Sequence, residues 1–291
     1  MVYYPTNKIR VPVNKKNVIE SGIVKEEDFE LIVDYIDIDL PKSGLYKNRL
    51  MMLDILNNND WKRPIYFTGG SFQDEEYIWM KDYLQLEGLV YKLVPIKTPE
   101  NPENPYQLGR IDSEKMLKII KKWDWGNSKS RNIYHDPETR KNSISFRSNL
   151  VRLADKLIQE EKFEKAEEVL DIAMENMPVE FFGFYSLLTP FVSAYQKIDR
   201  DEKANSLATT LNTKYIQKLN FFKSFNLKSQ QNYSEQIFTE IERYRNLVDS
   251  SCDYNDKNGF CHILIQDFIK NTSDFSLPVS YTHLTLPTNT P

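Results

Sequence analysis

The chain has 291 residues, with 38 Lys and Arg against 42 Asp and Glu, a net charge of −4, 9 glycines and 14 prolines. This composition excludes collagen-like and low-complexity proteins, and a hydrophobic fraction of 40% excludes wholesale disorder. Because the net charge is slightly negative, we expect no nucleic-acid partner. The length predicts two domains or one large domain.

The chain has two cysteines and three histidines, too few and too scattered for a disulfide framework or a metal-ligand cluster. We therefore expect no metal and no cofactor, while one bridge between Cys252 and Cys261 stays open. No signal peptide opens the sequence. The most apolar stretch, Phe181–Tyr195, falls short of the ~20 residues of a membrane helix, so the sequence alone predicts a soluble chain.

The first part of the chain alternates between strand and helix patterns. Leu31–Leu40 alternates as a half-buried strand does, and a helix follows at Leu50–Asn59. Arg63–Thr68 predicts a second strand, Asp74–Leu84 a helix and Leu89–Val94 a third strand. A strand, a crossover helix and a strand within ~30 residues indicate a βαβ unit with a parallel sheet.

One more helix completes this part. Asp112 and Ser113 suit a helix N-terminus, and the helix buries an apolar face that ends at Trp123. We predict a mixed α/β module over residues 1–126 and a polar linker over residues 127–142. The fold class is therefore α+β or α/β, followed by an all-helical module.

From Ser143 the pattern is helical, and a degenerate 34-residue tetratricopeptide repeat fits it from Arg147 onward. The predicted packing positions of this unit are Leu150, Leu153, Ala154, Leu157, Ala166, Leu170 and Ala173. A second unit from Tyr185 predicts Leu188, Phe191, Val192, Tyr195, Ala204, Ala208 and Leu211. The offset between the units is four residues longer than the standard period. A helix over Ser229–Val248 would cap the array, which places tetratricopeptide-like repeats at residues 143–250.

The C-terminal end differs from the rest of the chain. Residues 251–291 predict disorder, and residues 275–291 contain no Asp, Glu, Lys or Arg. Ser280–Thr288 resembles translated sequencing-adaptor sequence, so we expect residues 275–291 to be a non-native tail. Whether Cys252 and Cys261 are native stays open.

Two short motifs in the first module suggest chemistry. Thr68–Ser71 follows a predicted strand, which favours a tight turn over an anion site because the Lys of a phosphate-binding loop is missing. Asp37, Asp39 and Asp74 would converge at the carboxyl edge of a parallel sheet. They can then act as acid and base or hold a divalent cation, although carboxylates at strand and helix ends are more often simply solvated.

A second candidate site surrounds the linker, where flat aromatic faces alternate with polar side chains that suit a sugar or a peptide. Its residues are Trp123, Asp124, Trp125, Asn127, Tyr134, His135, Asp136 and Arg140. Packing between the modules is the competing explanation. We do not assign His135 and Asp136 as a catalytic pair, because adjacent residues rarely orient each other and no nucleophile accompanies them.

Six blocks carry a family resemblance that runs from about residue 3 to residue 248. They resemble the C-terminal region of a large bacterial family of multi-spanning membrane proteins, formerly of unknown function and now grouped with GT-C glycosyltransferases. That family is similar to the animal transmembrane protein O-mannosyltransferases. The blocks are Pro5–Val13, Ile36–Asn48, Trp61–Phe72, Tyr83–Pro95, Trp123–Asn127 and Tyr134–Asn142.

The resemblance implies that this chain is a truncated C-terminal part on the extracytoplasmic, periplasmic side of the inner membrane. Its partners would be the missing N-terminal transmembrane region, an acceptor polypeptide and a lipid-linked sugar. The family's catalytic carboxylate lies in an early loop outside this chain, so we assign no catalytic residue and expect acceptor or partner recognition. The alternative is a stand-alone interaction scaffold. A hydrolase that uses Asp37, Asp39 or Asp74 would need a deep acidic pocket.

Overall fold

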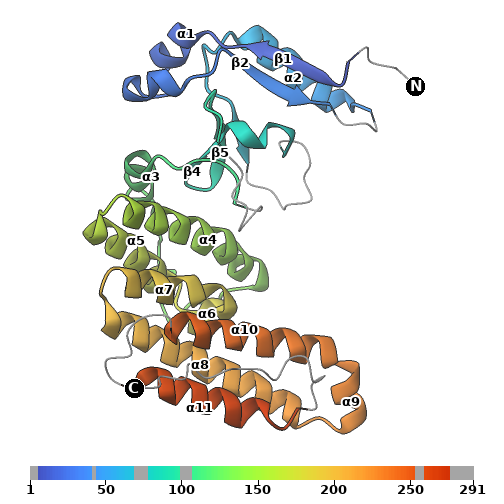
Figure 1. Cartoon of the computed structure of the whole chain (residues 1–291), viewed down its shortest axis with the longest axis vertical. Helices are drawn as coiled ribbons and strands as arrows, with labels where there is room; N and C mark the ends of the chain where they lie inside the picture. Colours follow the sequence, from blue (N-terminus) through green and yellow to red (C-terminus); the bar gives the residue numbers. More distant parts are fainter. Residues whose placement is uncertain (1–5, 41–43, 69–77, 99–106, 253–258, 276–291) are drawn as a thin grey trace, which may run out of the picture. The chain divides into compact units, whose positions relative to one another are not determined.

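The computed structural model describes residues 6–40, 44–68, 78–98, 107–252 and 259–275 (Figure 1). The chain divides into two compact units, Met1–Asp124 and Trp125–Pro291. The first unit holds two small antiparallel sheets with short helices, and the described part of the second unit is helical. The predicted order, a mixed α/β module followed by an all-helical module, is confirmed.

The first sheet pairs β1 (Lys8–Pro12) with β2 (Tyr35–Asp39) in antiparallel fashion. Between them lie α1 (Lys15–Glu20) and the 3₁₀ helix η1 (Glu26–Leu31). In β2 the side chains alternate between buried and exposed, as the sequence pattern predicts. The observed strand begins later than predicted, because the chain is still in the 3₁₀ helix at Leu31.

The core of the first unit gathers behind this sheet. Helix α2 (Lys47–Asn59) ends where the asparagine run predicts, and Trp61 follows it into the core. The indole Nε1–H of Trp61 donates to the carbonyl oxygen of Pro12 at 2.9 Å, so the buried ring keeps its hydrogen bond. The apolar residues packed together here include Val18, Ile36, Ile38, Leu56, Met80, Leu93 and Val94.

The second sheet corrects the βαβ prediction. Its strands are β3 (Tyr66–Thr68), β4 (Leu84–Glu87) and β5 (Val90–Leu93), in the order β3-β5-β4, and both pairings are antiparallel. The 3₁₀ helix η2 (Ile78–Tyr83) precedes β4, and the other residues of the predicted crossover helix lie outside the described residues.

The physical reason for this topology lies in the local sequence. Leu84–Glu87 alternates with period two, and Gly88 adopts a left-handed conformation with φ of 69°. Gly88 therefore turns the chain directly from β4 into β5. The two strands form an antiparallel hairpin, with no helix between them. The turn predicted at Thr68–Ser71 continues into residues that the structure does not describe.

Helix α3 (Ser113–Ile120) forms as predicted. The side chain of its N-cap residue, Asp112, accepts a hydrogen bond from the backbone N–H of Lys115 at 3.0 Å. Met116, Leu117 and Ile120 are buried, which fixes the face that the helix presents to the unit.

The second unit is built from helices packed in consecutive pairs. Helix α4 (Pro137–Gln159) packs against α5 (Phe163–Asn176), and α7 (Thr189–Lys197) packs against α8 (Asp201–Lys223). All the predicted packing residues are buried, including alanines that let the helix backbones approach closely. Periodicity in the sequence therefore located this core.

Two short elements explain why the repeat is stretched. Between α5 and α7 the chain forms α6 (Val179–Phe182) and the 3₁₀ helix η3 (Tyr185–Leu188). Gly183 joins them with φ of 66°, and these turns occupy the extra length.

A buried arginine fixes this junction. Arg147 of α4 is fully buried, and its two terminal nitrogens donate to the carbonyl oxygens of Met177 at 2.7 Å and Gly183 at 2.6 Å. Both carbonyls lie at helix C-termini, where backbone acceptors lack helical partners. Arg147 therefore satisfies the ends of α5 and α6 together.

A third helix pair, preceded by a short helix, completes the described part of the second unit. Helix α9 (Leu227–Asn232) leads into α10 (Ser234–Cys252), and α11 (Phe260–Thr272) packs against α10 and α8. A disulfide joins Cys252 to Cys261. The range 251–291 therefore contains a helix where the sequence predicts disorder, because its Leu264 and Phe268 find buried places on the preceding helices.

The range 127–142, expected as a linker, contains the start of α4. The side chain of Asp136 accepts from the backbone N–H groups of Glu138 and Thr139, and Pro137 occupies the first helical turn. An Asp N-cap followed by proline is a strong helix start, so the polar composition of this segment does not indicate a linker throughout.

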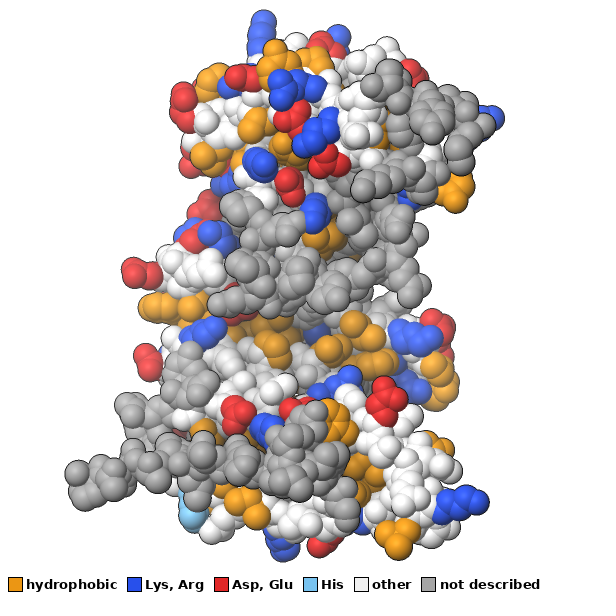
Figure 2. Space-filling view, turned by 45° about the vertical axis from the view of Figure 1, so that its right-hand side comes forward, with side chains coloured by type: hydrophobic (Ala, Val, Ile, Leu, Met, Phe, Trp, Pro, Cys, Tyr) orange, Lys and Arg blue, Asp and Glu red, His pale blue; other side chains and the backbone are white. Residues whose placement is uncertain are grey.

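Exposed hydrophobic side chains stand among charged ones on the surfaces of both units (Figure 2). Within the described ranges, no helix has the length and apolar character needed to cross a membrane.

Candidate binding sites

The residues of the predicted aromatic site belong to both units. Trp123 and Asp124 end the first unit, and Trp123 packs over the β4–β5 turn. A Cβ atom on Gly88 would lie 3.1 Å from the ring carbon Cζ2 of Trp123, so a side chain at this position would crowd the ring. Asp124 is exposed. The indole thus packs within the first unit, against the turn between β4 and β5.

The remaining residues of the predicted site belong to the second unit. The ring of Trp125 lies 5.4 Å from that of Phe146, and the ring of His135 lies 4.6 Å from that of Phe182. Tyr134 is 82% exposed.

Asn127 is also exposed, Asp136 is the N-cap of α4, and Arg140 is half-buried with its Nε–H buried. The rings of Trp125 and His135 pack against phenylalanines, whereas Tyr134 faces solvent.

The acidic edge does not form as predicted, because the sheets are antiparallel. Asp37 pairs with Arg10 at 2.7 Å and Asp39 pairs with Lys8 at 3.2 Å, with all four side chains exposed. The hydrogen bond from Arg10 lowers the pKa of Asp37, which makes it a poor proton donor. Asp74 lies outside the described residues.

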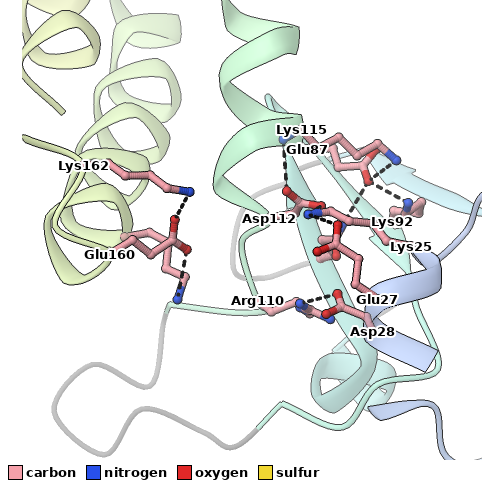
Figure 3. A network of polar contacts seen from close by, with 12 residues as sticks. Lys25, Glu27, Asp28, Glu87, Lys92, Arg110, Asp112, Lys115, Glu160 and Lys162 are labelled. Atoms are coloured by element: carbon pink, nitrogen blue, oxygen red, sulfur yellow. Dashed lines mark hydrogen bonds and ion pairs between the residues drawn. The ribbon is translucent and has the colours of Figure 1, made fainter. Parts of the chain in front are cut away.

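A buried charge cluster occupies one face of the second sheet (Figure 3). Glu87 of β4 forms ion pairs with Lys92 of β5 at 2.8 Å and with Lys115 of α3 at 2.9 Å. Its carboxylate also accepts from Gln85 Nε2 at 2.8 Å and from the Tyr66 hydroxyl at 3.2 Å. Tyr66, Lys92 and Gln85 lie side by side across the three strands, so the antiparallel register itself assembles the cluster.

Burial and hydrogen bonding together set the pKa values of this cluster. The side chains of Lys92 and Glu87 are 1% and 5% exposed. Burial lowers the pKa of Lys92 to about 8. Burial also acts to raise the pKa of Glu87, but the hydrogen bonds from Lys92 and Lys115 outweigh it and lower that pKa. One carboxylate therefore holds two cations, the buried Lys92 and the partly exposed Lys115.

Two further ion pairs flank this cluster (Figure 3). Lys25 lies 3.0 Å from Asp112, whose side chain is 5% exposed, and Arg110 lies 2.8 Å from Asp28. The whole network links η1, the sheet and α3 within the first unit. Its central charges are inaccessible to solvent, so it is suited to hold the unit together rather than to bind a ligand.

The second unit contains a polar groove with a cavity of about 440 Å³, a volume within the range of ligand pockets. Three elements contribute its charged and amide groups: Asp155 from α4, Lys197 from α7, and Arg243 and Asn246 from α10. The first helices of successive pairs therefore line it. The other lining residues are Ser186, Thr189, Pro190, Ser193 and Ser250.

The groove contains both hydrogen-bond donors and hydrogen-bond acceptors. Lys197 Nζ lies 3.7 Å from Asp155, and burial raises the pKa of Asp155. At α10 the guanidinium of Arg243 lies 3.2 Å from Glu240, which also accepts from the Tyr185 hydroxyl at 2.8 Å. Serine and threonine hydroxyls and the Asn246 amide both donate and accept, which suits the backbone of an extended peptide.

The groove residues carry no recognisable sequence motif. They fall between the packing positions of the repeat, and solvent-facing polar residues of a helix give no signal of their own. The packing pattern places the first helices of successive pairs side by side, so polar residues on those helices were the available clue.

Among the described residues, no three His, Cys, Asp or Glu side chains lie close enough together to hold a metal ion.

Residues 1–115 match the family model described as TMEM260-associated domain 2. This match links the first unit to TMEM260-related proteins. Neither the search of curated proteins nor the search of solved structures found a match.

Proposed function

We propose that this chain is the recognition part of a GT-C-type membrane glycosyltransferase related to the protein O-mannosyltransferases. The match to TMEM260-associated domain 2 and the six sequence blocks support this assignment. The membrane-spanning, catalytic part of the same protein is the first partner that we propose. This chain would add no catalytic residue of its own.

The observation that carries the recognition role is the polar groove of the second unit. Its hydroxyls and amide suit a peptide backbone, and Arg243 suits a carboxylate of the bound segment. We propose that an extended, Ser/Thr-containing stretch of the acceptor polypeptide binds there.

The architecture of the second unit supports the same role. Consecutive helix pairs with buried alanines at their contacts are the arrangement of tetratricopeptide-like repeats, which bind peptides along the surface formed by their first helices. The groove lies on that surface, since α4, α7 and α10 line it.

The disulfide supports an extracytoplasmic location. Bridges such as Cys252–Cys261 form and persist in oxidising compartments and are rare in the cytosol. We therefore propose that this part of the protein lies on the periplasmic side of the inner membrane.

Fluorescence anisotropy with a labelled Ser/Thr-rich peptide that carries one carboxylate tests the proposal. The chain should bind saturably, and Arg243→Gln or Asn246→Leu should weaken binding at least about tenfold, or about 1.4 kcal/mol. Arg131→Gln, at an exposed position outside the groove, is the matched control and should leave the Kd unchanged. Equal binding by all variants would show that the groove is not the peptide site.

Two further outcomes separate the alternatives. Displacement of the peptide by a polyprenyl-phosphate-linked sugar would show that the groove takes the donor and would overturn the acceptor assignment. If the groove serves as an interaction scaffold and does not present the acceptor, Arg243→Gln in the full-length protein should abolish peptide binding yet leave sugar transfer unchanged.

A further inference from the structure

One end of the second unit carries an aromatic cluster at its surface. The cluster consists of Phe221 and Phe222 of α8, Phe225 of the following turn, and Tyr233 before α10. The ring of Phe225 lies 4.8 Å from that of Phe221 and 5.5 Å from that of Tyr233. These contacts make the cluster a packed, preformed structure.

Large apolar groups of this cluster face solvent. Phe221 is 53% exposed and Tyr233 is 45% exposed, and Leu227, at the first position of α9, is 78% exposed. The Asn226 side chain caps α9 by accepting from the backbone N–H of Ser229 at 2.9 Å, and Gln230 Nε2 donates to the carbonyl oxygen of Phe225 at 3.0 Å. The turn is therefore held in a shape that projects Leu227 outward.

Basic residues lie close to these apolar groups in the sequence. Residues 214–234 contain four lysines and no Asp or Glu. The ammonium of Lys218 lies 5.0 Å from the ring centre of Phe222 and 5.5 Å from that of Phe221. Among the described residues, no carboxylate lies within ion-pair distance of Lys214, Lys218 or Lys228, whereas Lys223 pairs with Asp274 at 2.8 Å.

We propose that this aromatic and basic end, which we call the α8–α9 tip, docks onto an anionic phospholipid surface. Leu227, Phe221 and Tyr233 would enter the region between headgroups and acyl chains, and the lysines would contact lipid phosphates. Apolar side chains next to unpaired lysines match a membrane interface, in which anionic headgroups lie above the apolar acyl chains. The whole chain carries a charge of −4, so attraction to such a surface must come from a local patch.

Cosedimentation of the full chain with vesicles tests this docking. The protein should bind vesicles that contain phosphatidylglycerol and should bind pure phosphatidylcholine vesicles at least about tenfold more weakly. Raising the salt concentration should weaken binding, because the lysine contribution is screened. No binding to phosphatidylglycerol vesicles at low salt would overturn the proposal and leave the tip as a contact for another protein.

Substitutions of exposed apolar residues distinguish membrane insertion at the tip from nonspecific hydrophobic binding. Leu227→Ser and Phe221→Ser should each weaken binding several-fold, and together at least about tenfold. Ile263→Ser is the matched control, since Ile263 is 55% exposed but lies two residues from Cys261, which is bonded to the far end of α10. Helix α10 has 19 residues, so about 28 Å separates that end from the tip. Equal losses for Ile263→Ser and Leu227→Ser would contradict a specific docking surface.

Charge variants complete the test. Lys228→Gln should weaken binding about fivefold, as expected for one lysine at an anionic surface. Lys165→Gln changes the net charge equally from an exposed position on α5 and should have little effect. If both lysine variants bind alike, the attraction would not be local to the tip. Unchanged thermal unfolding of each variant would show that these surface substitutions leave the fold intact.

Discussion

The two units each bury a basic side chain, and they satisfy its charge by different means. In the first unit, Lys92 lies beside a carboxylate, Glu87, which it shares with Lys115. In the second unit, Arg147 has no ion-pair partner within the described residues and donates to two helix-end carbonyls. The planar guanidinium spreads its charge over several donors, so backbone dipoles can replace a counter-ion, whereas a compact ammonium ion is best stabilised by an anion.

The contrast follows from the architecture of each unit. A sheet places side chains from three strands on one face, so Tyr66, Lys92 and Gln85 meet in a row, with Glu87 beside them. A helix pair ends in free carbonyl groups, and these gather where α5 and α6 stop. Each unit thus neutralises its buried cation with the acceptors that its own secondary structure supplies.

Removing the carboxylate partner of Lys92 should have the largest effect on stability. Glu87→Gln leaves Lys92 buried without a counter-ion, and we expect the free energy of unfolding of the first unit to fall by about 3–5 kcal/mol. Hydrogen exchange of the β4 and β5 amides as a function of urea measures it. Glu20→Gln, which breaks an exposed ion pair with Lys16, should change stability by less than about 1 kcal/mol. A loss as small as that of the control would show that Lys92 does not depend on its carboxylate.

Removing the arginine should have a smaller but still large effect. Arg147→Met takes two charge-assisted hydrogen bonds from the carbonyls of Met177 and Gly183, and we expect about 2–4 kcal/mol of lost stability in the second unit. Arg147→Lys should recover only part of it, because one ammonium group cannot reproduce the forked geometry. Urea unfolding followed by exchange of the α5 amides provides the measurement. Full recovery by lysine would remove the distinction between the two units.

The smallest expected effect is a pH dependence specific to the first unit. The pKa of Lys92 is about 8 in the folded unit against an ordinary value of 10.5. Between these values the unfolded chain binds more protons than the folded one, so this lysine makes stability rise with pH across that interval.

The comparison with Lys92→Met isolates this contribution. The difference in unfolding free energy, wild type minus variant, should increase from pH 8 to pH 10.5. Lys115 acts in the opposite direction because its pKa is raised by Lys92 and Glu87 against the effect of burial, which makes the net slope shallow. A difference that stays flat or falls over this interval would mean that Lys92 keeps an ordinary pKa.

Local sequence predicted more of the second unit than of the first. The packing positions of α4, α5, α7 and α8 recur with helical spacing, and every predicted one is buried. In the first unit the same procedure predicted a parallel βαβ arrangement and missed the β4–β5 hairpin. Helix contacts are set within a few turns of chain, whereas strand pairing depends on which distant segments meet.

The candidate sites show the same limit. Trp123 and Asp112 could be interpreted from neighbouring residues, as the end of an apolar face and as a helix cap. Lys92 and Glu87 alternate with apolar residues and therefore resemble the solvent face of a strand. Only the packing of α3 against β4 and the burial of both side chains show that this face is covered.

By itself, the sequence determined the order of the two modules, the buried residues of the helix pairs and the blocks that carry a family resemblance. Those properties follow from local periodicity and from residue identity. The tertiary structure alone decided that the sheets are antiparallel, that α11 completes a third pair, and that a lysine–glutamate cluster and a polar groove exist. Each of these requires side chains from separate segments to come within a few ångströms, and the burial that changes their chemistry arises only once the segments pack.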